Sequence, residues 1–123
     1  MTVYRITLAV FAHGLIASGN PARWNSKDVK MIYTAQSRSL ACLENIVHRN
    51  SRGLRDEYKV LLIDIPDSLK MSAIEGPDLP DGWQGFENIP YTQSLGDQWI
   101  KASNSCILIV KRHFSKDIVY FIL

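Results

Sequence analysis

An arginine, a tyrosine and a glutamate are spaced along the first half of the chain so that they could build one binding site. Tyr33 follows Arg23 by ten residues, and Glu44 follows Tyr33 by eleven. A guanidinium can grip a diphosphate bidentately, an aromatic ring can stack on a flat heterocycle, and a carboxylate can stabilise developing positive charge. Together these groups suit a dinucleotide such as NAD, whose cleavage at the nicotinamide leaves positive charge on the ribose.

Two of these residues, and an arginine near the start of the chain, also have ordinary structural interpretations. Arg23 could be a surface arginine whose aliphatic stem packs on Trp24. Tyr33 could be a core residue at the end of a strand. Arg5 is a charge within an otherwise apolar segment, so it must point outward or into a polar site. The sequence leaves these alternatives open beside the functional ones.

Glu44 is the anomalous residue of the predicted first helix. Its neighbours at helical spacing are mainly apolar, namely Leu40, Ala41, Val47 and His48. A carboxylate on such a face is costly to bury unless it is paired. It is either a half-exposed glutamate touching His48 or an acid facing a cleft, where it could hold ribose hydroxyls and stabilise an oxocarbenium-like transition state.

The surrounding elements predict an α+β chain with a mixed or antiparallel sheet, because strands outnumber helices. Strands are expected at Val3–Ile6, Val29–Tyr33, Tyr58–Ile65, Cys106–Val110 and Ile118–Leu123. The run Tyr58–Ile65 is almost continuously apolar, which is typical of a central strand covered on both faces.

Two helices are expected. The first follows Thr34 or Ser37, either of which can cap it. Its apolar stripe comprises Leu40, Leu43, Ile46 and Val47. Residues 66–94 are rich in proline and glycine, so they are predicted to be a long irregular segment. A second, short helix is expected to start at Leu95, with Asp97 favourable in its first turn.

Composition excludes several classes of protein. A chain of 123 residues predicts one domain, and a net charge of +2 is too weak to argue for nucleic-acid or membrane binding. Apolar runs fall short of the roughly 20 residues of a membrane helix. The three histidines and two cysteines lack metal-ligand spacing, so no metal is expected. A reduced, cytoplasmic protein without direct nucleic-acid or membrane contact is the prediction.

Six short segments, in this order, resemble the RES domain family, the toxin half of RES–Xre bacterial toxin–antitoxin pairs. They are Tyr4-Arg5-Ile6, Ala22-Arg23-Trp24-Asn25-Ser26-Lys27, Ile32-Tyr33-Thr34-Ala35, Leu40-Ala41-Cys42-Leu43-Glu44, Leu79-Pro80-Asp81-Gly82-Trp83 and Leu95-Gly96-Asp97-Gln98-Trp99. The resemblance covers roughly residues 3–110 and is carried by the order of the segments rather than by any one of them.

The resemblance implies a fold similar to ADP-ribosyltransferases and an enzyme that consumes NAD. Members cleave the nicotinamide–ribose bond by hydrolysis, by phosphorolysis or by transfer of ADP-ribose to a protein. The family's arginines would be Arg5 and Arg23, its aromatic residue Tyr33 and its glutamate Glu44. A cognate Xre-type antitoxin with a DNA-binding domain would block the cleft.

The end of the chain departs from this pattern. After Val110 the family has a proline and then its serine, whereas Lys111 and Arg112 stand here. The expectation is a single RES-like domain over residues 1–123 with an atypical or shortened end, and weak or no NAD turnover. A catalytically inactive, truncated RES remnant that binds the antitoxin is the second hypothesis, and an unrelated small α+β binding domain is the third.

Overall fold

The computed structural model describes residues 1–47, 57–111 and 118–122. Its helices and strands are β1 (Thr2–Leu8), β2 (Ile32–Ala35), α1 (Arg38–Val47), β3 (Tyr58–Asp64), β4 (Met71–Ile74), α2 (Ile89–Ala102), β5 (Ile107–Lys111) and β6 (Ile118–Ile122). Short 3-10 turns lie at Ala9–Phe11, Gly76–Asp78 and Phe86–Asn88. The described strands form one sheet in the order β3-β1-β2-β6-β5-β4. Since β4 and β5 pair in parallel and the other neighbours are antiparallel, the predicted α+β class with a mixed sheet is confirmed.

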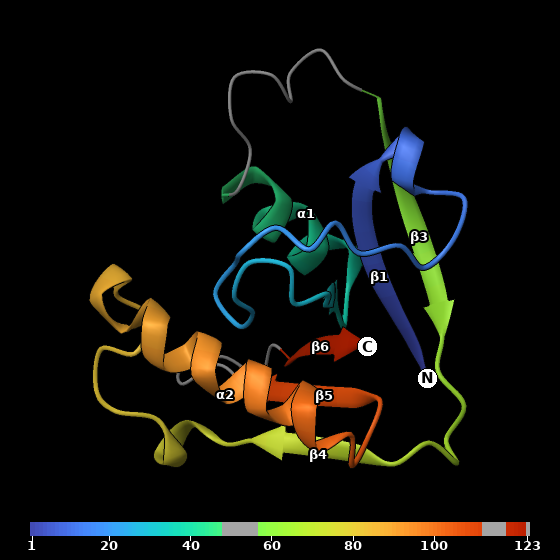
Figure 1. Cartoon of the computed structure of the whole chain (residues 1–123). Helices are drawn as coiled ribbons and strands as arrows, with labels where there is room; N and C mark the ends of the chain where they lie inside the picture. Colours follow the sequence, from blue (N-terminus) through green and yellow to red (C-terminus); the bar gives the residue numbers. More distant parts are fainter. Residues whose placement is uncertain (48–56, 112–117, 123) are drawn as a thin grey trace.

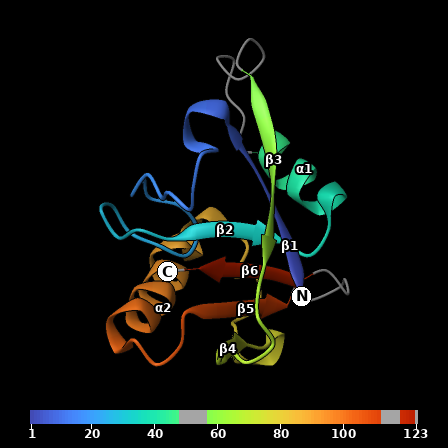
Figure 2. The ribbon, with the colours of Figure 1, turned by 90° about the vertical axis from the view of Figure 1, so that its right-hand side faces the viewer.

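The sheet has two parts that meet at one point. β1 and β3 pair along their whole length, from Thr2↔Asp64 to Leu8↔Tyr58. β1 and β2, by contrast, pair through Tyr4↔Ala35. Figures 1 and 2 show the consequence: β1 and β3 run across the direction of β2, β6, β5 and β4.

The two helices pack on separate apolar clusters. The cluster under α1 joins Leu40 and Ala41 to Ala35 of β2, with Tyr4 and Ile6 of β1 against it. The cluster under α2 is larger and contains all three tryptophans; its buried members are Trp24, Met31, Leu79, Trp83, Trp99, Leu108 and Val110. A third cluster comprises Val3, Ile32, Ile65 and Ile107. The alternation of Ile107 and Leu108 between clusters is the ordinary alternation of side chains along a strand.

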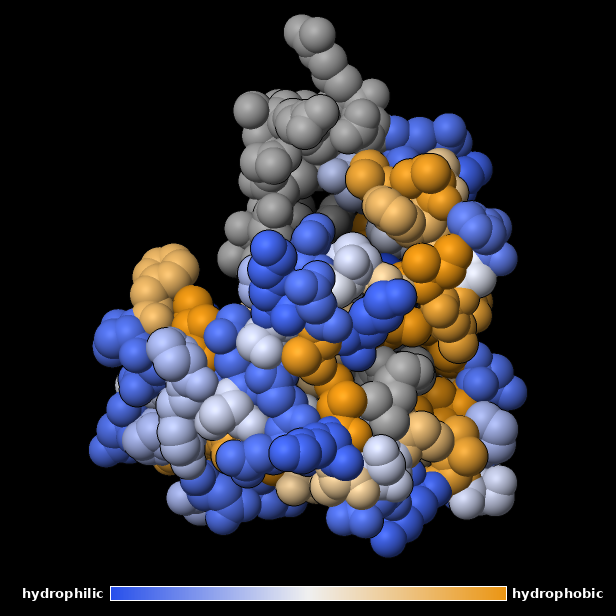
Figure 3. Space-filling view, in the orientation of Figure 1, coloured by the Kyte–Doolittle hydropathy of each residue, from blue (hydrophilic) through white to orange (hydrophobic). Residues whose placement is uncertain are grey.

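The prediction that the apolar run Tyr58–Ile65 is a central strand was wrong. β3 is the first strand in the sheet order, and its residues alternate in exposure. Val60 and Leu62 are 45% and 55% exposed. Hydrophobic surface is visible on the side of the molecule where β3 lies (Figure 3). The reason is that apolar residues give a high strand propensity without specifying how many neighbours the strand has.

The prediction of one irregular segment over residues 66–94 was also wrong. It contains β4 and the first turns of α2. α2 begins at Ile89, six residues before the predicted start at Leu95, with a proline in its first turn, where the missing N–H costs nothing. Asp97 therefore lies in the second half of α2, and the predicted role of its charge at a helix start was wrong as well.

Other boundaries moved by smaller amounts. β2 starts at Ile32 rather than Val29, because the Val29 N–H donates to the Ser26 carbonyl at 3.1 Å in a turn. Ser37 rather than Thr34 accepts the cap hydrogen bond of α1, from the Leu40 N–H at 3.1 Å. In the predicted stripe of α1, Leu40 is buried but Leu43 is 52% exposed. The side chains of residues 46 and 47 lie outside the described part.

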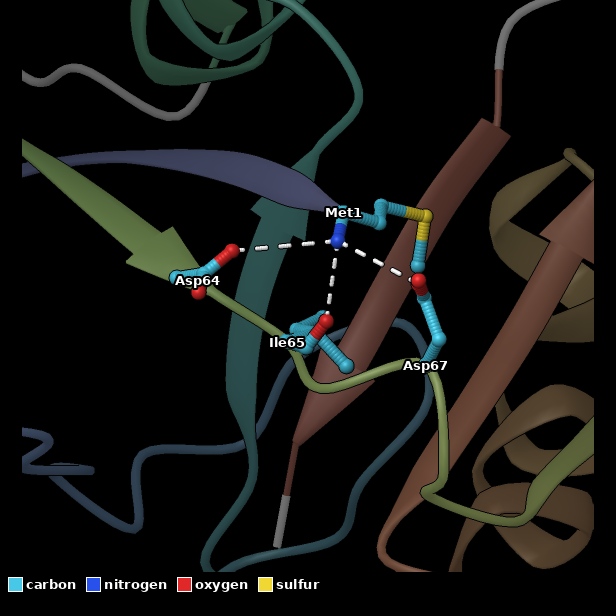
Figure 4. Close-up of polar contacts among 4 residues, drawn as sticks. All are labelled: Met1, Asp64, Ile65 and Asp67. Atoms are coloured by element: carbon cyan, nitrogen blue, oxygen red, sulfur yellow. Dashed lines mark hydrogen bonds and ion pairs between the residues drawn. The ribbon is translucent and has the colours of Figure 1, made fainter.

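The amino end of the chain is held against the end of β3 (Figure 4). The Met1 ammonium donates to the Ile65 carbonyl at 2.9 Å and lies 3.7 Å from Asp64 and 3.5 Å from Asp67. These carboxylates are 85% and 97% exposed, so the hydrogen bond to the backbone fixes the strand end more than the ion pairs do.

Candidate functional site

Residues 19–29, here called the arginine loop, carry Arg23 between the first 3-10 turn and β2. The loop is closed by its own backbone: the Ala22 N–H donates to the backbone carbonyl of Asn25 at 3.0 Å, and the Asp28 N–H donates to the backbone carbonyl of Gly19 at 2.8 Å. Gly19 and Asp28 both have positive φ, 78° and 68°. A glycine accepts this left-handed geometry without a steric cost, and Asp is among the residues that tolerate it.

Asn25 fills the interior of the arginine loop. It is 1% exposed, and its side-chain amide nitrogen donates to the backbone carbonyl of Asn20 at 2.9 Å and to that of Val29 at 2.8 Å. Its amide oxygen accepts a hydrogen bond from the hydroxyl of Tyr33. Because a buried amide is costly to leave unsatisfied, these bonds specify the shape of the loop and tie it to β2.

Tyr33 is therefore held by its hydroxyl. Besides donating to Asn25, this oxygen accepts the N–H of Trp24 at 3.1 Å. Burial is the largest of the effects that raise the pKa of the Tyr33 hydroxyl well above its usual value. The group stays neutral at physiological pH and keeps its proton for Asn25, so the hydroxyl has a structural task, and the ring is half-buried against the cluster of the three tryptophans.

Arg23 lies against Trp83, in the segment before α2. Its Nη1 donates to the Trp83 carbonyl at 3.3 Å, and its guanidinium carbon lies 6.0 Å from the centre of the Trp83 ring. The rings of Trp24 and Trp83 are 5.6 Å apart and tilted by 52°. The cation–π contact and the carbonyl both favour this position of the guanidinium. The aromatic ring beside the guanidinium is thus that of Trp83.

The structure places the Tyr33 hydroxyl beside the backbone that directly follows Arg23. The two residues belong to adjoining segments joined by Trp24 and Asn25, and the positive charge of Arg23 is one of the effects that lower the pKa of Tyr33 against burial. Two of the four predicted site residues thus share one neighbourhood.

Arg5 is placed in the middle of β1. Its neighbours Tyr4 and Ile6 face the α1 cluster, so Arg5 faces the other side of the sheet, where Val3 is buried. Its Nη1 donates to the Ile16 carbonyl at 2.8 Å, and burial lowers the pKa of the guanidinium. Arg5 is thus partly buried and hydrogen-bonded to a backbone carbonyl. Its convergence with Arg23 remains a prediction.

The backbone of Glu44 lies in α1, but its side chain is outside the part of the chain that the structure describes, as is His48. Both interpretations of Glu44 therefore remain predictions. Leu40 and Ala41, one turn earlier, are buried against the sheet.

Sequence reasoning missed the residues of α2 that hold the arginine loop. Thr92 Oγ1 donates to the Arg23 carbonyl at 2.6 Å. Asp97 accepts both the N–H of Ser26, at 3.0 Å, and its hydroxyl, at 2.6 Å. Pro90 was the available signal, because a proline is favourable in the first turn of a helix. A helix predicted to start there would have contained both Thr92 and Asp97.

The described residues contain no group of three histidine, cysteine, aspartate or glutamate side chains that could hold a metal ion. Both cysteines are free. In the same described ranges, no helix combines the length and apolarity needed to cross a bilayer.

The chain is similar to a known family of domains. The family model described as the RES domain matches residues 2–111. This match agrees with the fold class that the resemblance implies, similar to the ADP-ribosyltransferases.

Three curated proteins are similar in sequence. A Prs ADP-ribosylating toxin of Sphingobium sp. (strain YBL2) is 39% identical over 90 residues, which cover 72% of this chain and 56% of that protein. A protein named Toxin Res of Yersinia enterocolitica is 32% identical over 114 residues, covering 89% of this chain and 74% of that protein. Another Toxin Res, of Photorhabdus laumondii, is 30% identical over 114 residues, with 89% and 72% covered. The aligned region therefore spans little more than half of the Sphingobium protein.

Proposed function

Because this chain belongs to the RES domain family, we propose that it is a toxin that cleaves NAD at the nicotinamide–ribose bond. One relative is named for ADP-ribosylation, a reaction in which that bond is broken, and two others are named as toxins. The observation that carries the proposal on this chain itself is the fixed arrangement of Arg23 and Tyr33 around the arginine loop.

Arg23 is the group proposed to grip the diphosphate. A guanidinium presents its N–H groups in a planar fork that matches two phosphate oxygens. Contact with Trp83 favours one position of this fork before any ligand arrives, which supports the proposal because less conformational entropy is then lost on binding. Arg5, whose own environment is partly buried, is proposed to contribute a second cation.

Tyr33 and Glu44 are proposed to act at the nicotinamide end. The ring of Tyr33 would stack on nicotinamide, its plane fixed by the hydroxyl bonds to Trp24 and Asn25. Glu44 would stabilise the positive charge that develops on the ribose. Nicotinamide leaves as a neutral molecule with the electron pair of the broken C–N bond. An oxygen of water, phosphate or a target side chain then bonds to the same ribose carbon.

The partner proposed for the toxin is an Xre-type antitoxin protein that covers the NAD site. Covering would exclude the substrate without any change in the fold. This chain is not proposed to contact nucleic acid itself, since its net charge of +2 provides little of the electrostatic attraction that such contact requires.

The test is to incubate the purified protein with NAD and separate the products by chromatography. We expect nicotinamide in all active samples, with ADP-ribose if water attacks, a phosphorylated ADP-ribose if inorganic phosphate attacks, or a labelled protein if a side chain attacks. Each acceptor is added in turn. No nicotinamide with any of the three acceptors would overturn the enzymatic proposal.

A role without catalysis is the second candidate, and Lys111 favours it. This residue ends β5 where the resemblance leads us to expect a proline and then the family's serine. In that case the chain would bind the antitoxin but release no nicotinamide. Pull-down of a co-expressed Xre-type protein together with an NAD assay separates the two candidates.

A further inference from the structure

One face of α2 contacts successive residues of the arginine loop. The contacts come from positions 92, 93, 96 and 97 of the helix, a spacing that puts side chains on neighbouring positions of one helical face. They meet residues 22, 23, 24 and 26 of the loop: Gln93 contacts residue 22, Thr92 residue 23, Gly96 residue 24 and Asp97 residue 26. The tight turn between Ala22 and Asn25, and Ser26 after it, therefore lie against α2.

Side chains of α2 make hydrogen bonds at both ends of this stretch, residues 22–26. The Gln93 amide donates to the Ala22 carbonyl at 2.8 Å, and Thr92, which is fully buried, donates to the Arg23 carbonyl at 2.6 Å. At the other end, both oxygens of Asp97 accept hydrogen bonds from Ser26. The carbonyl of the arginine itself is thus one of the groups that the helix holds.

Gly96 lies between these ends and lets the two backbones touch. A Cβ added to Gly96 would lie 1.7 Å from the Trp24 carbonyl oxygen and 2.8 Å from its carbonyl carbon. Both are backbone atoms, which cannot swing aside as a flexible side chain can. In a helix interior, glycine is about 1 kcal/mol less favourable than alanine, so space for the loop, rather than helix stability, explains this residue.

The backbone of Trp24 connects this contact to Tyr33. Its carbonyl touches Gly96, while its N–H donates to the Tyr33 hydroxyl at 3.1 Å. The preceding residue is Arg23, whose carbonyl is bound by Thr92. A displacement of the loop from α2 would therefore move both groups that are proposed to contact NAD.

We propose that Gly96 and Asp97, with Thr92 and Gln93, are positioning residues that set Arg23 for the diphosphate of NAD. They act through the backbone of the arginine loop and make no contact with the substrate. This inference rests on the proposed function, because it assigns those residues to the same site.

Gly96→Ala is the principal test, since the variant adds one methyl group and removes no chemical group. A misplacement of about 1 Å can cost about 100-fold in rate, and we expect a loss of that order in kcat/KM for NAD. The dissociation constant of NAD, measured by calorimetry, should rise, because Arg23 is proposed to act in substrate binding. Gly14→Ala is the matched control: a Cβ there would meet nothing closer than 4.0 Å.

Asp97 supplies a second test that a general loss of stability would not reproduce. Asp97→Ala removes both acceptors of Ser26, whereas Asp97→Asn keeps one acceptor and gains an N–H that can donate to the Ser26 hydroxyl. We expect Asp97→Asn to retain NAD affinity within about 10-fold and Asp97→Ala to resemble Gly96→Ala. Equal losses in both Asp97 variants would count against positioning through Ser26.

Amide hydrogen exchange separates failure of the inference from failure of the proposed function. In Gly96→Ala, exchange at Trp24 and Ser26 should accelerate while β5 stays protected. Unchanged exchange and unchanged NAD kinetics in this variant would overturn the inference. If the unmodified chain neither binds nor cleaves NAD, the proposed function fails and positioning for NAD fails with it, while exchange still reports whether α2 holds the loop.

Discussion

The hydroxyl of Tyr33 donates a hydrogen bond to the side-chain oxygen of Asn25, a residue that is 1% exposed. The bond joins β2, the strand that follows the arginine loop, to the centre of that loop. It makes the tyrosine a structural part of the site, as well as a candidate for stacking on the substrate.

Tyr33→Phe should destabilise the fold while keeping the ring. The substitution leaves the buried oxygen of Asn25 without the hydroxyl, and an unsatisfied buried acceptor costs about 1–3 kcal/mol. Urea unfolding followed by circular dichroism measures the change. Tyr91→Phe is the control, since that residue is 43% exposed. An unchanged unfolding midpoint for Tyr33→Phe would show that the bond contributes nothing.

The same hydroxyl predicts a loss of stability at alkaline pH. An unfolded tyrosine ionises near pH 10, but burial raises the pKa of Tyr33 in the folded protein. The stabilisation is thus complete below about pH 10 and decreases above it, by at most about 1.4 kcal/mol per pH unit. Between pH 8 and pH 10 the unfolding midpoint of Tyr33→Phe should stay below that of the unmodified protein, and the difference should shrink above pH 10, because only the unmodified protein loses this stabilisation. Parallel curves would exclude Tyr33 as the source of the alkaline loss.

Arg23→Lys should weaken NAD binding. A lysine keeps the charge but loses the planar fork, and losing a hydrogen bond to a charged group costs about 1.5–3 kcal/mol, or about 10- to 100-fold in affinity. Calorimetry with NAD measures the change. Arg38→Lys is the matched control, because Arg38 also lies over an aromatic ring, 5.6 Å from the centre of Tyr4, but at the start of α1. Equal affinities for the two variants would argue against a grip by Arg23.

Glu44→Gln should retain the fold and lose about 100- to 1000-fold in the rate of nicotinamide release, because the amide preserves shape without the negative charge. The control is Glu57→Gln, which also removes one carboxylate: the Glu57 side chain is 72% exposed and pairs with Lys59 at 3.1 Å. Full activity of a folded Glu44→Gln variant would reject the proposed role of the carboxylate.

Several elements followed from the sequence alone because their signals are local. Ser37 was one of two predicted caps for α1, and the apolar runs of β1, β5 and β6 were found within a few residues of their bounds. A cap hydrogen bond reaches three residues along the chain, and strand propensity needs only the run itself. The order of short segments also indicated the family, which the match over residues 2–111 confirms.

Local signals could not give the order of the strands. The run Tyr58–Ile65 was predicted correctly as a strand but wrongly as a central one, because burial of β3 depends on which strands come beside it. The start of α2 was missed for a different reason: the proline and glycine residues before Leu95 concealed a proline that is compatible with a helix start.

The residue types of the candidate site were determined by the sequence, and their arrangement was decided by the tertiary structure. Arg23, Tyr33 and Glu44 were chosen for their chemistry. The folded chain adds contacts that the sequence did not indicate, between Arg23 and the Trp83 ring and between the Tyr33 hydroxyl and Asn25. The hydrogen bonds between Ser26 and Asp97 connect residues 71 positions apart. No periodicity or motif spans such a distance, because that contact exists only once α2 has packed on the core and brought its glycine against the arginine loop.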